Sequence, residues 1–148
     1  MRLLAGICAL AALTTPSALA EDATPSYSDP FIGEWQIAFP DEPGVIVNVP
    51  DATCEAPAVI SASDTSENPN AVDISTPGGS WGEWHVRSFD GRFPWWQFDP
   101  EKNDYTDITF VADWTSEDTF LLAGKDSSGW RTDWTTAKEW TRCPTEAD

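Results

Sequence analysis

Basic residues are scarce in this chain. Its 148 residues include 8 Lys and Arg but 25 Asp and Glu, which gives a formal net charge of −17 at pH 7. Charge of this sign repels the phosphates of nucleic acids and an anionic lipid surface. We therefore expect neither nucleic-acid binding nor membrane insertion. Residues 21–86 contain twelve acidic and no basic residues, which we interpret as a means of solubility, with an acidic face for a cationic partner as the alternative.

Histidine is even scarcer. His85 is the only one, and no serine or cysteine near it forms a nucleophile motif, so catalysis by a Ser–His or Cys–His pair has no support. A zinc site would need more nitrogen and sulfur ligands than this chain can supply. We therefore expect no enzymatic activity, no cofactor and no metal, and we interpret His85 as a strand residue with a satisfied hydrogen bond.

The chain also lacks a long apolar run. The longest, Leu3–Leu13, is shorter than the roughly 20 residues that span a bilayer. It follows Arg2 and precedes Ala18-Leu19-Ala20, a small-x-small cleavage site. This order is typical of a secretory signal peptide. We expect residues 1–20 to be removed and the mature protein to be exported, either to a periplasm or to the medium.

Few cysteines remain after such cleavage. Removal of Cys8 leaves Cys54 and Cys143. An even pair in an exported chain predicts one disulfide. Closing the long loop between these two cysteines would stabilise the fold by roughly 4–5 kcal/mol in the chain-entropy model.

Helical periodicity is absent from the rest of the chain. Short runs of β-branched and aromatic residues occur instead, separated by Pro, Gly, Asn and Asp, and this pattern is typical of strands. Asp90-Gly91 predicts the tip of a hairpin, and residues 125–129 predict another. The predicted strand runs are Gly33–Phe39, Val45–Val49, Ala58–Ala62, Val72–Ser75, Trp81–Ser88, Pro94–Phe98, Thr106–Trp114, Thr119–Ala123 and Trp130–Arg142, the last long enough for two strands.

These runs lie in one predicted domain. We expect a flexible polar leader over residues 21–30, the folded domain over 31–144 and a tail over 145–148. Many short antiparallel strands in a single small domain favour an all-β fold, namely an up-and-down barrel of about eight strands. A β-sandwich is the alternative.

The start of the first predicted strand carries a recognisable motif. Gly33-Glu34-Trp35 resembles the Gly-x-Trp signature of the lipocalins and the wider calycin superfamily. The resemblance implies that Trp35 closes one end of an eight-stranded barrel and that Arg142, near the end of the last strand, packs over it, a contact worth roughly 0.5–2 kcal/mol. It implies an exported binding protein for a small or aromatic ligand.

A second group of small exported barrels shares this Gly-x-Trp start. It includes protease inhibitors with one disulfide. Their likeness implies the alternative function, a protein-interaction or protease-inhibitor-type module whose barrel is solid.

Tryptophan is abundant, with nine in the chain. Core packing is the simplest use of so many indole rings, and a surface on which a sugar or an aromatic ligand stacks is the functional alternative. Trp95 and Trp96 are adjacent, so on a strand they point to opposite faces. The predicted ligand-binding residues are Trp81, Trp84, His85, Trp95 and Trp96, flanked by Glu83, Gln97 and Asp99 as partners for hydroxyl groups.

Two acidic patterns suggest further chemistry. Glu34 and Glu83 each precede a tryptophan, and two such carboxylates would suit a glycosidase. Strand alternation points Glu34 away from the core, however. A hydrolase that acts on sugars is therefore the least favoured of the functional hypotheses. The stretch Asp99–Asp107 resembles a calcium loop, yet Asp104 stands at its glycine position and Phe110 at its bidentate glutamate position. We expect a solvated acidic turn there, with a loose Ca²⁺ contact as the alternative.

Overall fold

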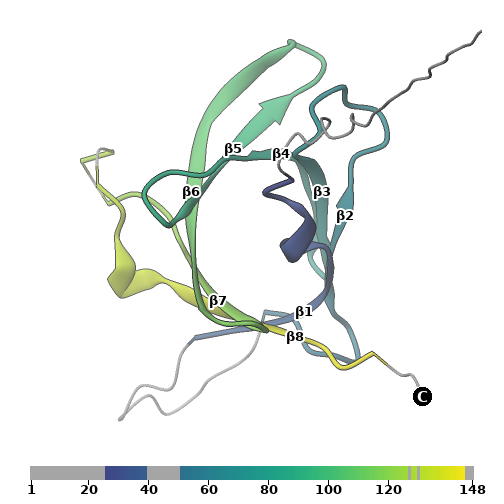
Figure 1. The fold of residues 1–148 in the computed structure, drawn as a ribbon, viewed down its shortest axis with the longest axis vertical. Helices are drawn as coiled ribbons and strands as arrows, with labels where there is room; N and C mark the ends of the chain where they lie inside the picture. Colours follow the sequence, from purple (N-terminus) through teal and green to yellow (C-terminus); the bar gives the residue numbers. More distant parts are fainter. Residues whose placement is uncertain (1–25, 40–50, 127, 130, 146–148) are drawn as a thin grey trace, which may run out of the picture.

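Eight antiparallel strands form one closed barrel in which each strand pairs with the next and β8 pairs with β1. The computed structural model describes residues 26–39, 51–126, 128–129 and 131–145. Figure 1 shows the ring of strands with the short helix that precedes β1 lying inside it. The strands are β1 (Gly33–Ala38), β2 (Ala58–Ala62), β3 (Ala71–Thr76), β4 (Gly79–Val86), β5 (Phe93–Asp99), β6 (Asp104–Ser116), β7 (Thr119–Ala123) and β8 (Lys138–Arg142). The predicted all-β, up-and-down barrel is confirmed.

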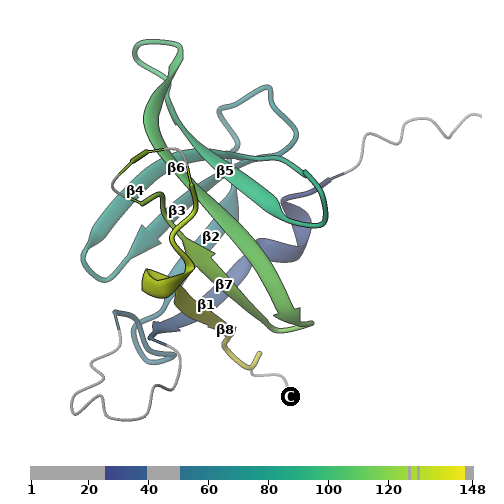
Figure 2. The ribbon, with the colours of Figure 1, turned by 90° about the vertical axis from the view of Figure 1, so that its left-hand side faces the viewer.

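Most of the predicted runs correspond to strands. β2 and β7 match their predicted bounds residue for residue, and β6 is longer at both ends. Figure 2 shows how β5 and β6 extend as a hairpin beyond the neighbouring strands. The predicted hairpin tip at Asp90-Gly91 is confirmed, because both residues have a positive φ (54° and 81°), as this kind of turn requires. The predicted signal peptide and the run Val45–Val49 lie outside the described residues.

The last predicted run is wrong in its first half. Within its described residues, 131–142, only Lys138–Arg142 forms a strand, and Trp134–Thr136 forms a 3₁₀ turn, η3. The Asp133 carboxylate accepts hydrogen bonds from the Thr135 backbone N–H at 3.1 Å and from its hydroxyl, which favours a turn over a strand. The hairpin predicted near residues 125–129 is reduced to a single bridge between Lys125 and Thr132. No helix in the described part of the chain has the length and apolar content needed to cross a bilayer.

One end of the barrel is closed by the segment that precedes β1. The 3₁₀ turn η2 (Asp29–Phe31) places the Phe31 ring in the barrel, where it is fully buried. The Trp35 indole N–H donates to the Phe31 carbonyl at 2.8 Å. The Arg142 guanidinium lies over the Trp35 ring and donates to the Pro30 and Ile32 carbonyls at 2.8 and 3.2 Å. The contact expected between Arg142 and Trp35 is therefore present.

Gly33 explains the first position of the Gly-x-Trp motif. Its φ is +148°, and a Cβ atom built there would lie 3.2 Å from an Arg142 guanidinium nitrogen. A larger residue would be strained in its backbone and would press on the arginine. Glycine at this position therefore lets Arg142 reach Trp35.

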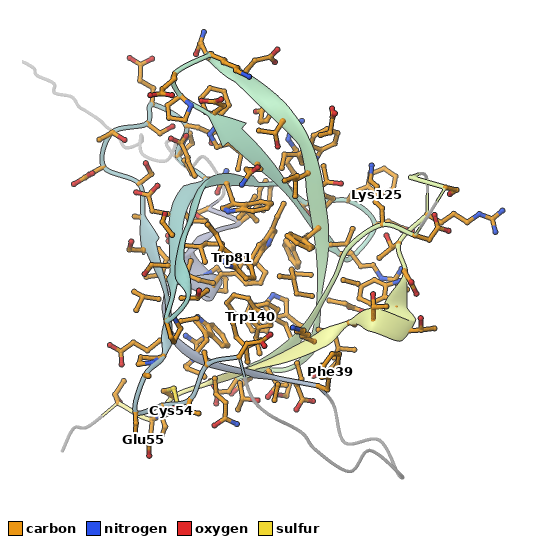
Figure 3. All side chains as sticks on the ribbon, turned by 180° about the vertical axis from the view of Figure 1, so that it is seen from behind. Phe39, Cys54, Glu55, Trp81, Lys125 and Trp140 are labelled. Atoms are coloured by element: carbon orange, nitrogen blue, oxygen red, sulfur yellow. A yellow bond between two sulfur atoms is a disulfide. The ribbon has the colours of Figure 1, made fainter. Side chains whose placement is uncertain are left out.

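Aromatic rings fill most of the interior. Their ring centroids form a series through the barrel. The distance between centroids is 5.0 Å from Phe31 to Phe120 and 5.4 Å from Phe120 to Trp140. It is 5.7 Å from Trp140 to Trp81. Figure 3 shows Trp81 and Trp140 inside the ring of strands. The barrel is therefore packed along most of its length, as protein interiors are. Its largest fully buried side chains are Trp35, Trp84, Trp95, Trp140, Phe31 and Phe120.

The predicted disulfide joins Cys54 and Cys143, whose Cα atoms lie 5.5 Å apart. Cys54 lies between β1 and β2, and Cys143 directly follows β8. The Cys143 backbone N–H also donates to the Glu34 carbonyl at 2.9 Å. The bridge therefore secures the seam where the first and last strands meet.

Candidate functional site

An apolar recess of about 330 Å³ opens at the end of the barrel opposite Phe31. Its walls come from Trp81 near the start of β4, Phe110 in β6 and Trp140 in β8, with Ile37 and Leu122 beside them. The start of β8 contributes to this recess, whereas its end, at Arg142, lies at the closed end. The recess is therefore the mouth of the barrel, and we call it the mouth recess.

The mouth recess has rigid aromatic walls. The rings of Trp81 and Phe110 are nearly parallel, with centroids 6.1 Å apart, and Trp81 meets Trp140 edge to face. Gly124 leaves the space open, because a Cβ atom there would lie 3.3 Å from the Phe110 ring. The recess therefore presents flat aromatic surfaces to whatever enters it.

Polar groups lie only at the edge of the mouth recess. Lys138 and Asp51 form an ion pair there, and the Lys138 ammonium lies 5.0 Å from the centroid of the Phe39 ring. Thr136 is the other polar residue that lines the recess. The site therefore combines apolar walls with a few polar groups, which is the usual composition of small-molecule pockets.

A second, polar cluster lies on the outer face of β4. Glu83 and His85 are only 6% and 5% exposed, although their side chains point away from the core. His85 Nε2 lies 2.6 Å from Glu83 Oε2, and its Nδ1 lies 3.0 Å from the Tyr105 hydroxyl and 3.2 Å from Asn68 Nδ2. The Phe98 ring stacks on the imidazole with centroids 4.6 Å apart. We call this set the His85 cluster.

Two polar recesses of about 440 and 480 Å³ flank Glu83. Asp73 lines the first, and it is the direct cross-strand partner of Glu83. Burial raises the pKa of the Asp73 carboxyl, and the negative charges of Glu83 and Asp64 raise it further. Like charges opposite each other on neighbouring strands destabilise a sheet, so this region carries uncompensated negative charge.

The five predicted ligand-binding residues do not converge on one site. Trp84 and Trp95 are core residues. Trp81 lines the mouth recess, and His85 lies in the outer cluster. Trp96 is on the outer face with the Arg87 guanidinium 5.3 Å from its ring centroid, so Trp95 and Trp96 do point to opposite faces, as alternation predicts.

Sequence analysis missed several residues of the mouth recess: Phe110, Leu122, Gly124, Lys138, Trp140, Ile37 and Asp51. Alternation along the last predicted run could have placed the Trp140 side chain inside, between the outward side chains of Glu139 and Thr141. No local pattern indicates that the start of β8 meets the start of β4 at the same end of the barrel, because that proximity follows from closure.

The two acidic patterns do not form the sites considered for them. Glu34 lines a recess beside the disulfide, whereas Glu83 lines the two recesses on the outer face of β4, so they share no pocket in the described structure. In the acidic turn, Asp99 accepts a hydrogen bond from the Glu101 backbone N–H and Asp104 accepts one from that of Tyr105. No group of three or more His, Cys, Asp or Glu side chains suited to a metal ion occurs among the described residues.

Comparisons of the chain with protein-family models, with curated proteins and with solved structures yield no significant match.

Proposed function

We propose that this protein is a non-catalytic, exported, lipocalin-like binding protein that holds a small, flat aromatic ligand in the mouth recess. The observation that carries the proposal is an open space of about 330 Å³, lined by Trp81, Phe110 and Trp140, in a barrel that is otherwise filled. Ligand pockets commonly measure about 300–1,000 Å³. This one is at the lower end, which suits one ring or two fused rings.

The packing around the recess supports tight binding of such a ring. Aromatic pairs contribute about 0.5–1.5 kcal/mol each beyond the area that they bury, and a ligand ring in the recess would meet more than one aromatic wall. Trp81 and Trp140 already contact each other, so binding costs little ordering of side chains. A pre-organised site loses less free energy on binding than a flexible one.

The disulfide supports export. A bridge between Cys54 and Cys143 persists only in an oxidising compartment, such as a periplasm or the extracellular medium. The predicted signal peptide would deliver the chain to that compartment.

A fluorescence titration tests the proposal. Indole and 1-anilinonaphthalene-8-sulfonate serve as a neutral and an anionic flat probe, and saturable binding with a change in emission is expected for at least one of them. Gly124→Ala narrows the recess against Phe110 and should weaken binding about tenfold or more, since a site of fixed shape excludes even one extra methyl group. Gly78→Ala is the matched control, because it adds the same methyl group in the β3–β4 turn at a residue that does not line the recess.

A second pair of variants separates the recess from the outer surface. Trp81→Ala should abolish saturable binding, whereas Trp96→Ala, which removes an indole from the outer face, should leave it unchanged. Urea unfolding of each variant shows whether the fold is retained. Absence of binding by the wild-type protein, or equal loss in both variants, contradicts the proposal.

One observation favours a second candidate, a protein-interaction or protease-inhibitor-type module. Phe89 is 73% exposed and sits in a tight turn closed by two backbone hydrogen bonds with Arg92, at 2.9 and 3.0 Å. A rigid loop that presents a large apolar side chain suits an anchor in a partner's pocket. Inhibition of a panel of serine proteases by the wild-type protein but not by Phe89→Ala would support this candidate, and lack of inhibition by either would eliminate the inhibitor form.

A further inference from the structure

The hydrogen bonds around Asn68 favour one arrangement of the His85 ring protons. The Asn70 backbone N–H donates to Asn68 Oδ1 at 2.8 Å, so the Asn68 amide must direct its Nδ2 group toward His85 Nδ1, 3.2 Å away. An amide nitrogen only donates hydrogen bonds, so Nδ1 accepts whenever it is bonded to Asn68. The ring proton is then on Nε2 and is donated to Glu83 Oε2 at 2.6 Å. An Nδ1 that accepts from Asn68 and an Nε2 that donates to Glu83 together make the neutral Nε2–H tautomer.

Asn70 connects this histidine to the closed end of the barrel. Its side-chain oxygen accepts hydrogen bonds from the backbone N–H groups of Tyr27 and Ser28, at 2.7 and 3.3 Å. Its carbonyl accepts one from the Val86 backbone N–H at 3.0 Å. Tyr27 and Ser28 directly precede η2, which carries Phe31. A continuous series of hydrogen bonds therefore runs from His85 to the segment that closes the barrel.

We propose that His85 is a proton-sensitive latch for the residues between β2 and β3 and, through Asn70, for the segment that carries Phe31. Neutral His85 holds Asn68 in place. Once Nδ1 is protonated, the Nδ1–H and the Asn68 amide N–H are both donors and face each other, so the hydrogen bond between Asn68 and His85 is lost. The new N–H donates to the Tyr105 hydroxyl instead, which lies 3.0 Å away. Residues 63–70 and 27–31 are then held less firmly.

Charged groups on several elements surround the latch. On β4 itself, Glu83 pairs with the imidazolium once it forms. Arg87, which directly follows β4, donates to the Tyr105 hydroxyl at 3.0 Å. That hydroxyl keeps a second acceptor position for the His85 proton. The remaining titratable groups facing the cluster are Tyr105 on β6, Asp73 on β3, Glu67 and Asp64 between β2 and β3, and Asp99 at the end of β5. Phe98 on β5 contributes an uncharged ring to the imidazole face.

Histidine is the usual residue of a proton-sensitive switch, because it is the side chain whose unperturbed form changes charge between pH 5 and 8. An exported protein meets variable acidity, so the closed end would loosen as its surroundings acidify. This regulation does not depend on ligand binding in the mouth recess, which lies at the other end of the barrel.

The single histidine makes a direct test feasible. In protein labelled with ¹⁵N-histidine, the ring resonances at neutral pH should show the Nε2–H tautomer, and their titration reports the protonation of His85 alone. Hydrogen exchange of residues 63–70 and 26–32, corrected for the intrinsic effect of pH, should become roughly 2–10-fold faster as His85 is protonated, the change expected for one lost hydrogen bond.

A variant in which protonation of His85 has the opposite effect on hydrogen exchange gives the sharper test. Asn68→Asp keeps an acceptor for the Asn70 N–H but offers a carboxylate to His85, so protonation of His85 should slow exchange in the same segments. Glu67→Gln removes a carboxylate from the same recess and should behave like the wild type. An Nδ1–H tautomer at neutral pH, exchange that does not change as His85 titrates, or the same sign in Asn68→Asp as in the wild type would overturn the proposal.

Discussion

The guanidinium of Arg142 lies over the indole of Trp35, with 4.4 Å between its Cζ atom and the ring centroid. The two residues are also direct cross-strand partners in the β8–β1 pairing. The contact therefore lies on the seam where the last strand meets the first. Because Arg142 also donates to carbonyls before β1, one side chain secures the seam and the segment that closes the barrel.

Arg142→Ala should lower the free energy of unfolding by about 2 kcal/mol, because it removes the cation–π contact and leaves the partly buried Ile32 carbonyl without a donor. Arg142→Lys should recover only part of the loss, since an ammonium cannot reach the indole and both carbonyls at once. Urea unfolding measures both. Arg131→Ala, at an exposed arginine, is the control and should change stability by less than about 0.5 kcal/mol.

Phe31→Ala should destabilise the protein by about 3–5 kcal/mol, as large-to-small changes at a buried aromatic residue do. Phe31 is fully buried and its ring meets those of Phe93, Trp95, Trp114 and Phe120. Thermal and urea unfolding measure the loss, with Phe89→Ala as a control at an exposed phenylalanine. A loss below about 1 kcal/mol would show that η2 does not belong to the core in solution.

Replacing both bridged cysteines, Cys54→Ser with Cys143→Ser, should lower the free energy of unfolding by about 4 kcal/mol, because the bridge closes a loop of 89 residues. A reductant should lower the melting temperature of the wild type to about that of the double variant, and it should leave the melting temperature of the double variant unchanged. Free thiols at both positions in the oxidised protein, detected by mass spectrometry after alkylation, would contradict the bridge.

Asp73→Asn should stabilise the protein at neutral pH by about 0.2–1 kcal/mol, because it removes the like charge opposite Glu83. The pKa of Asp73 is raised in the folded state, first by burial and then by Glu83 and Asp64. A raised carboxyl pKa means that ionised Asp73 costs stability above its folded pKa, and that this cost disappears below its ordinary pKa of 3.8. Urea unfolding at pH 7 and near pH 3 should therefore show the gain only at pH 7. Asp90→Asn, in an exposed turn, is the control.

Local patterns predicted the barrel because they report local physics. Alternation along Gly33–Phe39 and the Asp90-Gly91 turn reflect the pleat of a strand and the geometry of a tight turn, both set by neighbouring residues. The strand predicted over Trp130–Arg142 was wrong in its first half because the apolar pattern does not reveal a side chain that competes for backbone N–H groups. The Asp133 carboxylate does so and produces a turn.

The sequence by itself determined the strand pattern, the acidic surface and the Cys54–Cys143 pairing, because each depends on residue type or on a short spacing. The contact between Trp35 and Arg142 was implied by the resemblance of the Gly-x-Trp start to the lipocalin signature. Only the tertiary structure decided that indole rings fill the barrel, that Trp81, Phe110 and Trp140 leave a space at its mouth, and that Asn68 meets His85. These contacts join residues from separate strands and connections, and their positions follow from closing the sheet and packing its interior. No single segment contains that information.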